Sequence, residues 1–435
     1  MRWARVFLGV LVLVSLVFLF LAVRGEQNHP PVADAGSDPT VAVGALVILD
    51  GLASHDPDGE RLSFQWTQTT GPGITLSDPT AIRPTFTPTV TGTYTFHLVV
   101  NDGTVDSTPA RVDVVVQEEH DHQVTFSDRN LEWKIRRAIN KETGPLFRAD
   151  LIHLTRLELR RAGITDLMGI QYLSSLTWLD LGNNWITDLT PLLGLTNLTV
   201  LALEGNRIAD ITPLSELTNL TRLNLSGNQI TDLAPLSELT NLTVLQLSGN
   251  RISVLSPLSG LTNLTVLELG DNLISDLAPL DGLTNLTELW LWGNQISDLS
   301  ALSGLTNLRG LWLWQNQISD LSALSGLTNL SVLHIGNNQI VDISPLSGLI
   351  NLVRLNLMDN QVSDLSPLSG LTNMTLLWLW DNQVTDLSPL VANRGIGAGD
   401  RVWLHGNPLD LSPGSQNMRH IEDLRRRWVS VHVRL

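Results

Sequence analysis

One pattern of 22 residues runs eleven times in succession from Leu151 to Ala392, more than half of the 435-residue chain. The copy Leu239–Gly260 reads LTNLTVLQLSGNRISVLSPLSG, with leucine at positions 1, 4, 7 and 9 and asparagine at 12. Isoleucine or valine follows at position 14, and apolar residues stand at 17 and 20. A single unit of this length cannot bury its own apolar face, so neighbouring units must stack and share a continuous core. This stretch is therefore predicted to fold as a solenoid.

The spacing LxxLxLxxN within a period of 20–29 residues is the signature of leucine-rich repeats. Positions 7 and 9 alternate with polar or variable residues, which predicts a short strand with one buried face. The asparagine at position 12 follows that strand, and its amide can pair with backbone groups of its own and the neighbouring coil. Ten of the eleven copies carry it, from Asn184 to Asn382, whereas the first has Ala162, as expected of an end repeat.

The repeats resemble the 22-residue repeats of the internalin-type bacterial leucine-rich proteins. The motif N-Q-I-S-D-L-S-P-L, present at Asn360–Leu368 with Val362 in place of isoleucine, is characteristic of that family. The resemblance implies a curved, right-handed solenoid with a parallel sheet on its concave side and irregular or 3₁₀ turns on its convex side. It also implies that the concave sheet binds a protein.

Both ends of the array carry sequences that suit caps. Residues 125–150 form the predicted N-terminal cap, in which Asp128 caps a helix through Leu131 and Ile135. A helix there covers the exposed end of the array. Residues 393–435 form a degenerate last repeat and a C-terminal cap. Its closing helix, Ser415–Arg427, is predicted to bury Ile421, Leu424 and Trp428 on one face.

The N-terminal segment 1–25 predicts export. Arg2 and Arg5 precede the uncharged run Val6–Val23, and Arg24 closes it. This pattern is typical of a signal peptide or of an uncleaved N-terminal membrane anchor, and both remain open. We therefore expect an exported, bacterial protein of the cell envelope or the extracellular space, in contact with a membrane through this segment if it is not cleaved.

Residues 28–117 have a different composition, rich in Thr, Val, Pro and Gly. Short alternating runs at Ala45–Leu49, Leu62–Trp66, Thr93–Val100 and Ala110–Val116, separated by turn sequences, predict an antiparallel β-sandwich. The sequences PPVADAG, SHDPDG, FQWTQTTGP and TYTFHLVVNDG in this segment are similar to those of PKD-type immunoglobulin-like domains, which implies a spacer or adhesion module. Residues 118–124 form a polar linker. The predicted fold class is thus multidomain, an all-β sandwich followed by a leucine-rich repeat solenoid with helical caps.

Charge and composition exclude several function classes. The net charge of −16 and the pI near 4.9 argue against a nucleic-acid partner, because phosphates require a basic surface. The chain has no cysteine, which excludes disulfides, thiolate catalysis and cysteine-ligated zinc.

The candidate site is a row of tryptophans on the concave face. Side chains at positions 6, 8 and 10 of each repeat point opposite to the buried positions 7 and 9. The third and fourth repeats carry small or polar residues there, such as Val200, Ala202 and Glu204, whereas the C-terminal half carries large aromatic rings. Exposed aromatic patches of this size are rare on soluble monomers, and tryptophan beside arginine is typical of binding hot spots. The candidate ligand-binding residues are Trp290, Trp292, Trp312, Trp314, His334, Arg354, Met358, Trp378, Trp380 and Trp403.

Three interpretations of this face stay open. Its ligand is a protein or a glycan, since either suits flat aromatic rings. A homodimer joined through the tryptophans would also account for them. Alternatively the rings stack on one another, and the chain is a structural or spacer component with no specific ligand. We expect Gly310 and Gly336 to leave room beside the rings.

No enzyme, cofactor or metal site is predicted. The sequence has no HExxH, GxSxG, phosphate-loop or dinucleotide motif. Asp50, Asp56, Asp58 and Asp102 carry the oxygen ligands that Ca²⁺ prefers, but Asp-Pro-Asp-Gly is also a turn sequence, and we favour the turn. The aspartate at position 16 of most repeats recurs so regularly that we expect it to serve a turn as well.

Overall fold

The computed structural model describes residues 28–117 and 123–433, which form two compact units divided between His122 and Gln123. Each unit has a hydrophobic core of its own, and the two cores share no residue. The predicted signal or anchor segment 1–25 and most of the predicted linker 118–124 lie outside the described residues. Within the described residues, no helix is long and apolar enough to cross a membrane.

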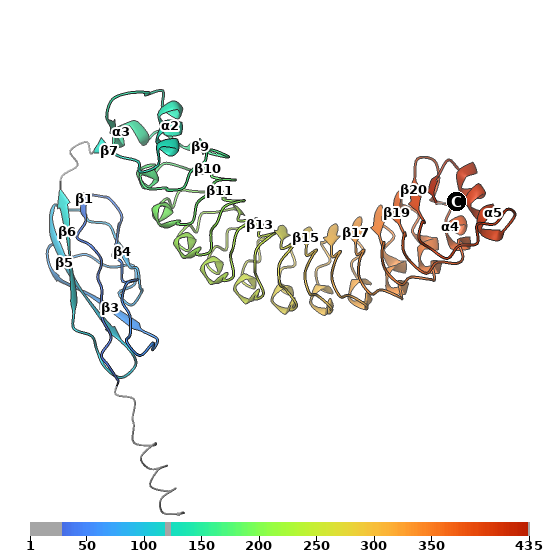
Figure 1. Ribbon diagram of the computed structural model, residues 1–435, viewed down its shortest axis with the longest axis horizontal. Helices are drawn as coiled ribbons and strands as arrows, with labels where there is room; N and C mark the ends of the chain where they lie inside the picture. Colours follow the sequence, from blue (N-terminus) through green and yellow to red (C-terminus); the bar gives the residue numbers. More distant parts are fainter. Residues whose placement is uncertain (1–27, 118–122, 434–435) are drawn as a thin grey trace, which may run out of the picture. The chain divides into compact units, whose positions relative to one another are not determined.

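The first unit is a small β-sandwich (Figure 1). Its larger sheet has the strand order β1-β6-β5-β3, and β2 pairs with β4 in a second sheet. Trp66 and Tyr94 are almost fully buried between the sheets, and the Trp66 indole donates a hydrogen bond to the carbonyl of Ala81 at 3.1 Å. The strands are β1 (Thr40–Ala42), β2 (Val47–Ile48), β3 (Ser63–Thr70), β4 (Thr85–Phe86), β5 (Gly92–Asn101) and β6 (Ala110–Gln117).

The sandwich is not wholly antiparallel as predicted. β1 pairs with β6 in parallel, with Thr40 opposite Val115. Two short strands, β1 and β4, were missed because runs of two or three residues show no periodicity. β3 also continues to Thr70, past its predicted end at Trp66, because it pairs along most of β5.

The second unit begins with a cap that buries the N-terminal end of the repeats. Helix α2 (Arg129–Ala138) starts at Asp128, whose carboxylate accepts the amides of Asn130 and Leu131, as predicted. Leu131 and Ile135 are fully buried against the first repeat. A hairpin of β7 (Gln123–Val124) and β8 (Leu146–Phe147), and the short helix α3 (Arg148–Leu151), complete the cap. Gln123 and Val124 were predicted in the linker and instead pair with β8.

One parallel sheet of thirteen strands runs along this unit, with eleven strands from the repeats and the last two from the C-terminal cap. Neighbouring strands pair at equal positions, for example Trp290 with Trp312, so each repeat position forms a row along the array. The strands are β9 (Arg156–Glu158), β10 (Trp178–Asp180), β11 (Val200–Ala202), β12 (Arg222–Asn224), β13 (Val244–Gln246), β14 (Val266–Glu268), β15 (Glu288–Trp290), β16 (Gly310–Trp312), β17 (Val332–His334), β18 (Arg354–Asn356), β19 (Leu376–Trp378), β20 (Arg401–Trp403) and β21 (Ser430–His432).

Short 3₁₀ helices return the chain on the opposite side of each coil, as the family resemblance implied. Figure 1 shows the strands on the inner side of the curved array and these turns on its outer side. The leucines of all coils form a single core between the two sides. The 3₁₀ helices are η1 (Ile170–Tyr172), η2 (Thr190–Leu192), η3 (Thr212–Leu214), η4 (Ala234–Leu236), η5 (Ser256–Leu258), η6 (Ala278–Leu280), η7 (Ser300–Leu302), η8 (Ser322–Leu324), η9 (Ser344–Gly348) and η10 (Ser366–Gly370).

The position-12 asparagines form a buried hydrogen-bond ladder, which confirms their predicted role. Asn228 donates to the carbonyls of Leu225 in its own coil and Leu203 in the preceding coil, both at 3.0 Å. Its side-chain oxygen accepts the amide of Ile208, also at 3.0 Å. The position-16 aspartates serve turns, as expected: Asp188 accepts the amide of Thr190 at 2.8 Å.

The C-terminal cap differs from its prediction at one residue. Helix α4 (Ser388–Ala392), β20, helix α5 (Gln416–Arg426) and β21 close the array, and Ile421 and Leu424 are buried as predicted. Trp428 was predicted on the same buried face, but its side chain is 80% exposed. The helix ends at Arg426, and Trp428 takes a left-handed conformation with φ 66°, which turns its ring out of the helical register.

Candidate functional site: the tryptophan-rich face of the parallel sheet

The inner face of the sheet changes character along the array. Over the first coils its side chains are mainly polar, with Arg160 paired to Asp180 and Glu204, and Gln246 bonded to Glu268 at 2.8 Å. From β15 onwards the same positions carry mostly aromatic rings, interrupted at Gly336, Asn356 and Met358. Both halves share one strand geometry, so the change lies in the side chains alone.

The first tryptophan block consists of Trp290, Trp292, Trp312 and Trp314 on two adjacent coils. Trp290 and Trp312 lie on paired strands, and their rings stack with centroids 4.1 Å apart and planes 22° apart. Trp292 and Trp314 lie two residues beyond the ends of these strands and stack at 5.0 Å and 7°. The four rings form two stacks, because position-matched pairing places each ring beside the ring of the next coil and the side-chain rotamers turn their faces together.

The second tryptophan block consists of Trp378, Trp380 and Trp403. Trp378 stacks on Trp403 at 5.1 Å and 7°. Two histidines that the sequence analysis did not single out extend the block: His405 lies 5.0 Å from Trp380, and His432 lies 5.0 Å from Trp403. Continuing the repeat register into β20 and β21 would have found both.

The residues between the blocks do not all reach the surface. His334 bridges the two blocks, with tilted contacts to Trp312 at 6.2 Å and to Trp378 at 5.6 Å. Burial, and to a lesser extent the charge of Arg354, lower the pKa of His334, so its imidazole is neutral near pH 7. Arg354 is exposed and Met358 is half-buried. Asn356 is buried, and its side-chain oxygen accepts the amide of Met358 at 3.0 Å.

Glycines accommodate the large side chains, but they do not leave free space as expected. A Cβ at Gly310 would lie 2.4 Å from the Trp312 ring, and one at Gly336 would lie 2.7 Å from Met358 Cγ. A Cβ at Gly270, in the coil before Trp292, would lie 2.3 Å from the Trp292 ring. The side chains at Trp292 and Met358 therefore lean back over the preceding coil, which carries glycine at the same position.

Stacking determines which parts of the rings are available to a ligand. All seven tryptophans of the two blocks are half-buried: six stack on one another in pairs, and Trp380 stacks on His405. Stacked rings turn their faces along the array, so their edges point away from the sheet. Ring edges carry positive partial charge, and indole N–H groups donate hydrogen bonds. Trp290 Nε1 is buried and has no hydrogen-bond partner in the described part of the chain.

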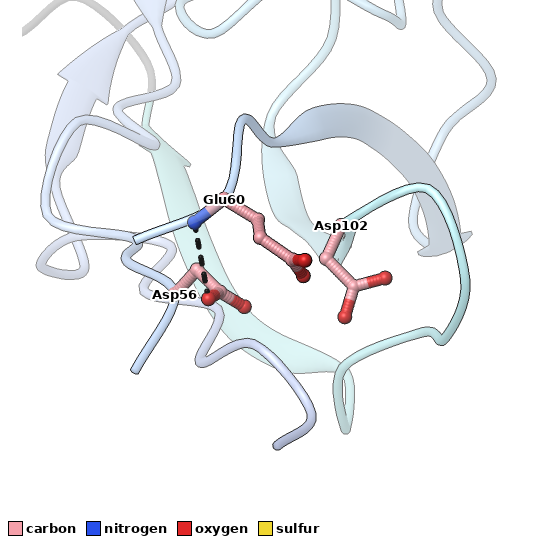
Figure 2. A group of neighbouring side chains, drawn as sticks. All are labelled: Asp56, Glu60 and Asp102. Atoms are coloured by element: carbon pink, nitrogen blue, oxygen red, sulfur yellow. Dashed lines mark hydrogen bonds between the residues drawn. The ribbon is translucent and has the colours of Figure 1, made fainter. Parts of the chain in front are cut away.

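The carboxylates of the sandwich form a second cluster, with one member that was not foreseen. Figure 2 shows Asp56, Glu60 and Asp102 turned toward one another, with oxygens within 4.8 Å. Asp56 Oδ1 accepts the amides of Asp58 at 2.7 Å and Glu60 at 3.2 Å. Desolvation opposes ionisation of Asp102, but its hydrogen bonds, including those from the amides of Val105 and Thr104, outweigh this effect and lower its pKa.

The other two candidate carboxylates are engaged elsewhere. Asp50 pairs with Arg83 at 3.0 Å, and Asp58 pairs with His29 at 3.0 Å. The four aspartates weighed as ligands for Ca²⁺ are thus not brought to one point. The hydrogen bonds of Asp56 and Asp102 are those of turns, and the expectation that no metal binds stays a prediction.

Comparison with protein families matches both units. A family model of the PKD domain matches residues 35–116. The model "Leucine Rich repeats (2 copies)" matches overlapping windows that together cover residues 174–348 and 350–392. A curated relative, the mouse (Mus musculus) "Dyslexia-associated protein KIAA0319-like protein", is 37% identical over 99 residues, which is 22% of this chain. The match spans 9% of the length of that relative.

Solved structures of bacterial leucine-rich proteins resemble the repeat unit. An internalin (inlF) from Listeria monocytogenes is 34% identical, with a TM-score of 0.67, and the match covers 71% of this chain and 91% of the internalin. The functional domain of InlJ from Listeria monocytogenes, whose structure includes a cysteine ladder, is 27% identical with a TM-score of 0.56. That match covers 66% of this chain and 67% of the InlJ chain. An LRR protein from Leptospira interrogans shares the fold, at 24% identity and a TM-score of 0.57 over 66% of this chain and 81% of its own.

The repeat period, the parallel sheet with 3₁₀ turns on its outer side and these likenesses agree. The chain belongs to the internalin-type leucine-rich repeat proteins and carries a PKD-like domain ahead of its repeats.

Proposed function

We propose that this protein recognises a protein or glycan ligand on the tryptophan-rich inner face of its repeats. One observation carries the proposal: seven tryptophans gather on one face of one half of the array, in two blocks of stacked rings. Solenoids of this kind use their concave surfaces for binding. Tryptophan, tyrosine and arginine are the residues enriched at binding hot spots.

The fold does not require these tryptophans. At the positions of Trp290 and Trp312, the coils of β11, β12 and β13 carry Ala202, Asn224 and Gln246. These strands have the same length and the same parallel register as the strands of the tryptophan blocks. A coil of this protein therefore forms without aromatic rings, and their concentration in one half supports a role in recognition.

The stacking contacts favour a second candidate function. An aromatic pair contributes about 0.5–1.5 kcal/mol beyond the area it buries. In a structural or spacer component with no specific ligand, rings that stack on one another would stiffen the C-terminal half of the array. The two functions predict different results when the rings are removed. A binding face would lose its ligand and stay folded, whereas a structural stack would lose folded structure.

The cellular setting is part of the proposal. The uncharged run Val6–Val23 supports export to the cell envelope or the extracellular space, with attachment to the membrane if the segment is retained. We also propose that the protein acts by non-covalent binding rather than catalysis, because its carboxylates follow the repeat and serve turns.

Replacement of the first tryptophan block tests the proposed function. The chain lacking residues 1–25 retains both cores, and we compare it with a variant in which Trp290, Trp292, Trp312 and Trp314 are replaced by serine. Binding is measured by surface plasmon resonance to purified envelope and host-surface proteins and to a glycan array. Sedimentation equilibrium measures homodimer formation. We expect a specific ligand or a dimer for the unaltered chain, and at least about a tenfold loss in the variant.

A matched control removes tryptophans from other surfaces. Trp133, Trp185 and Trp428 are exposed and lie outside both blocks, so their replacement by serine should leave binding unchanged. If the block variant loses its circular dichroism signal and the unaltered chain binds nothing, the rings are structural and the second candidate function holds. Equal loss in the control would show that the binding is non-specific.

A further inference from the structure

The two aromatic rows are interrupted at the same place. In the row that contains Trp292 and Trp314, the next coil carries Gly336 and the one after it Met358, before the row resumes with Trp380. In the row that contains Trp290 and Trp312, the buried Asn356 supplies no ring, and His334 contacts Trp378 across it. The break therefore lies between the blocks, on the side of Gly336 and Met358.

The break leaves one ring face without an aromatic partner. Trp314 stacks on Trp292 through one face, and among the described residues its other face meets no aromatic ring. Gly336 has no side chain to cover that face. Met358 is directed back over Gly336, where its Cγ would meet a Cβ at 2.7 Å. Trp314 and Met358 are thus the two side chains that border the break along this row.

The spacing suits one planar group. Coils of a parallel sheet lie about 4.8 Å apart, so two coils separate Trp314 from Met358 by roughly 10 Å. The rings of Trp292 and Trp314 stack at 5.0 Å. One further ring placed over Trp314 would continue the stack at that interval and would contact the Met358 thioether, a favourable neighbour for aromatic rings.

We propose that this break is the anchor subsite of the inner face, and that it takes one aromatic side chain of a protein partner between Trp314 and Met358. This inference rests on the proposed function. The rings of both blocks otherwise present edges, and a partner loop can pack against edges while it inserts a single side chain. Stacking leaves few free ring faces on which the successive sugar rings of a glycan chain could lie, so the break favours a single inserted side chain.

Nuclear magnetic resonance of methionine methyl groups tests the inference directly. The chain lacking residues 1–25 is labelled with ¹³C at its methionine methyls, and the signal of Met358 is assigned with a Met358→Leu variant. The probes are N-acetyl-tryptophanamide, N-acetyl-leucinamide and methyl β-D-glucopyranoside. We expect the tryptophan probe alone to shift the Met358 methyl upfield, in a saturable way with an affinity of about millimolar strength. The methyl signals of Met168, Met374 and Met418 should not shift when the tryptophan probe is added.

A blocking variant provides the second measurement. Gly336→Trp supplies the missing ring. Its Cβ would lie 2.7 Å from Met358 Cγ, which can move aside, and 3.1 Å from both Asn356 Oδ1 and the Met358 carbonyl oxygen, which must shift by a few tenths of an ångström. The Met358 methyl should then no longer respond to the tryptophan probe. Gly326→Trp is the matched control, because a Cβ at Gly326 meets no atom within 4 Å and the residue lies outside both rows. It should keep the full response, and circular dichroism checks that both variants are folded.

The outcomes separate this inference from the proposed function. If the probe shifts the indole N–H signals of the tryptophan blocks but not the Met358 methyl, the face binds aromatic groups elsewhere and the inference fails alone. An absent response at the solubility limit of the probe also overturns it, while the binding panel still decides the proposed function. A response to the glucoside equal to that of the tryptophan probe would overturn it too, because the subsite would then take a sugar ring.

Discussion

At the scale of single residues, the position-12 asparagine pairs with buried backbone groups that an apolar side chain would leave without a hydrogen bond. Its amide reaches two carbonyls and one backbone N–H in a dry interior, where unpaired polar groups cost about 1–3 kcal/mol each. The flanking leucines supply burial, but they cannot satisfy the backbone where the strand turns.

Asn228→Ala should destabilise the array by about 1–3 kcal/mol, since it leaves the amide of Ile208 unpaired and removes one of the two hydrogen bonds that the carbonyl of Leu203 accepts. Asn219→Ala, in the same coil, is the control, because this exposed asparagine makes a single hydrogen bond to the carbonyl of Thr196 at 2.8 Å. Its cost should stay below about 1 kcal/mol. Urea unfolding followed by circular dichroism measures both, and equal losses would contradict the ladder argument.

At the scale of elements, the N-terminal cap is joined to the first repeat through one carboxylate. Asp128 caps α2, and its second oxygen accepts the amide of Thr165 at 2.8 Å, 37 residues further along the chain. Desolvation opposes ionisation of Asp128, but the amides of Thr165, Leu131 and Asp166 outweigh it and lower its pKa below the ordinary 3.8. The sequence predicted the helix cap, whereas the bond to Thr165 depends on how the helix packs.

This shift predicts a pH dependence of stability. A carboxylate whose folded pKa lies below its unfolded pKa stabilises the fold above the unfolded value, and this contribution is lost as the pH falls through the folded value. Asp128→Asn should therefore cost about 1–2 kcal/mol at pH 7, and the difference from the unaltered chain should shrink below about pH 4. Urea unfolding at pH 7 and pH 3 measures it. A difference that is unchanged at pH 3 would show that Asp128 acts without its charge.

At the scale of the whole molecule, two separate cores predict two unfolding events. The sandwich core contains Trp66 and Tyr94, the repeat core contains the leucines of every coil, and no residue belongs to both. Calorimetry of the chain lacking residues 1–25 should show two transitions. Removal of residues 26–122 should abolish one of them and move the other by less than about 2 °C. A single transition that is lost altogether on this deletion would contradict independent cores.

The sequence by itself determined the solenoid, its core positions, its asparagine ladder, the helix caps and the face on which the tryptophans gather. The helix caps follow from local signals such as the N-cap Asp128. The other features follow from the 22-residue period, because identical coils must stack in one register and each position then becomes a row. The tertiary structure decided what lies outside that period. It stacked the tryptophan faces against one another, turned Trp428 outward, paired β1 in parallel with β6 and brought Glu60 to Asp56 and Asp102. These features depend on rotamers and on contacts between distant segments, and no spacing in the sequence encodes them.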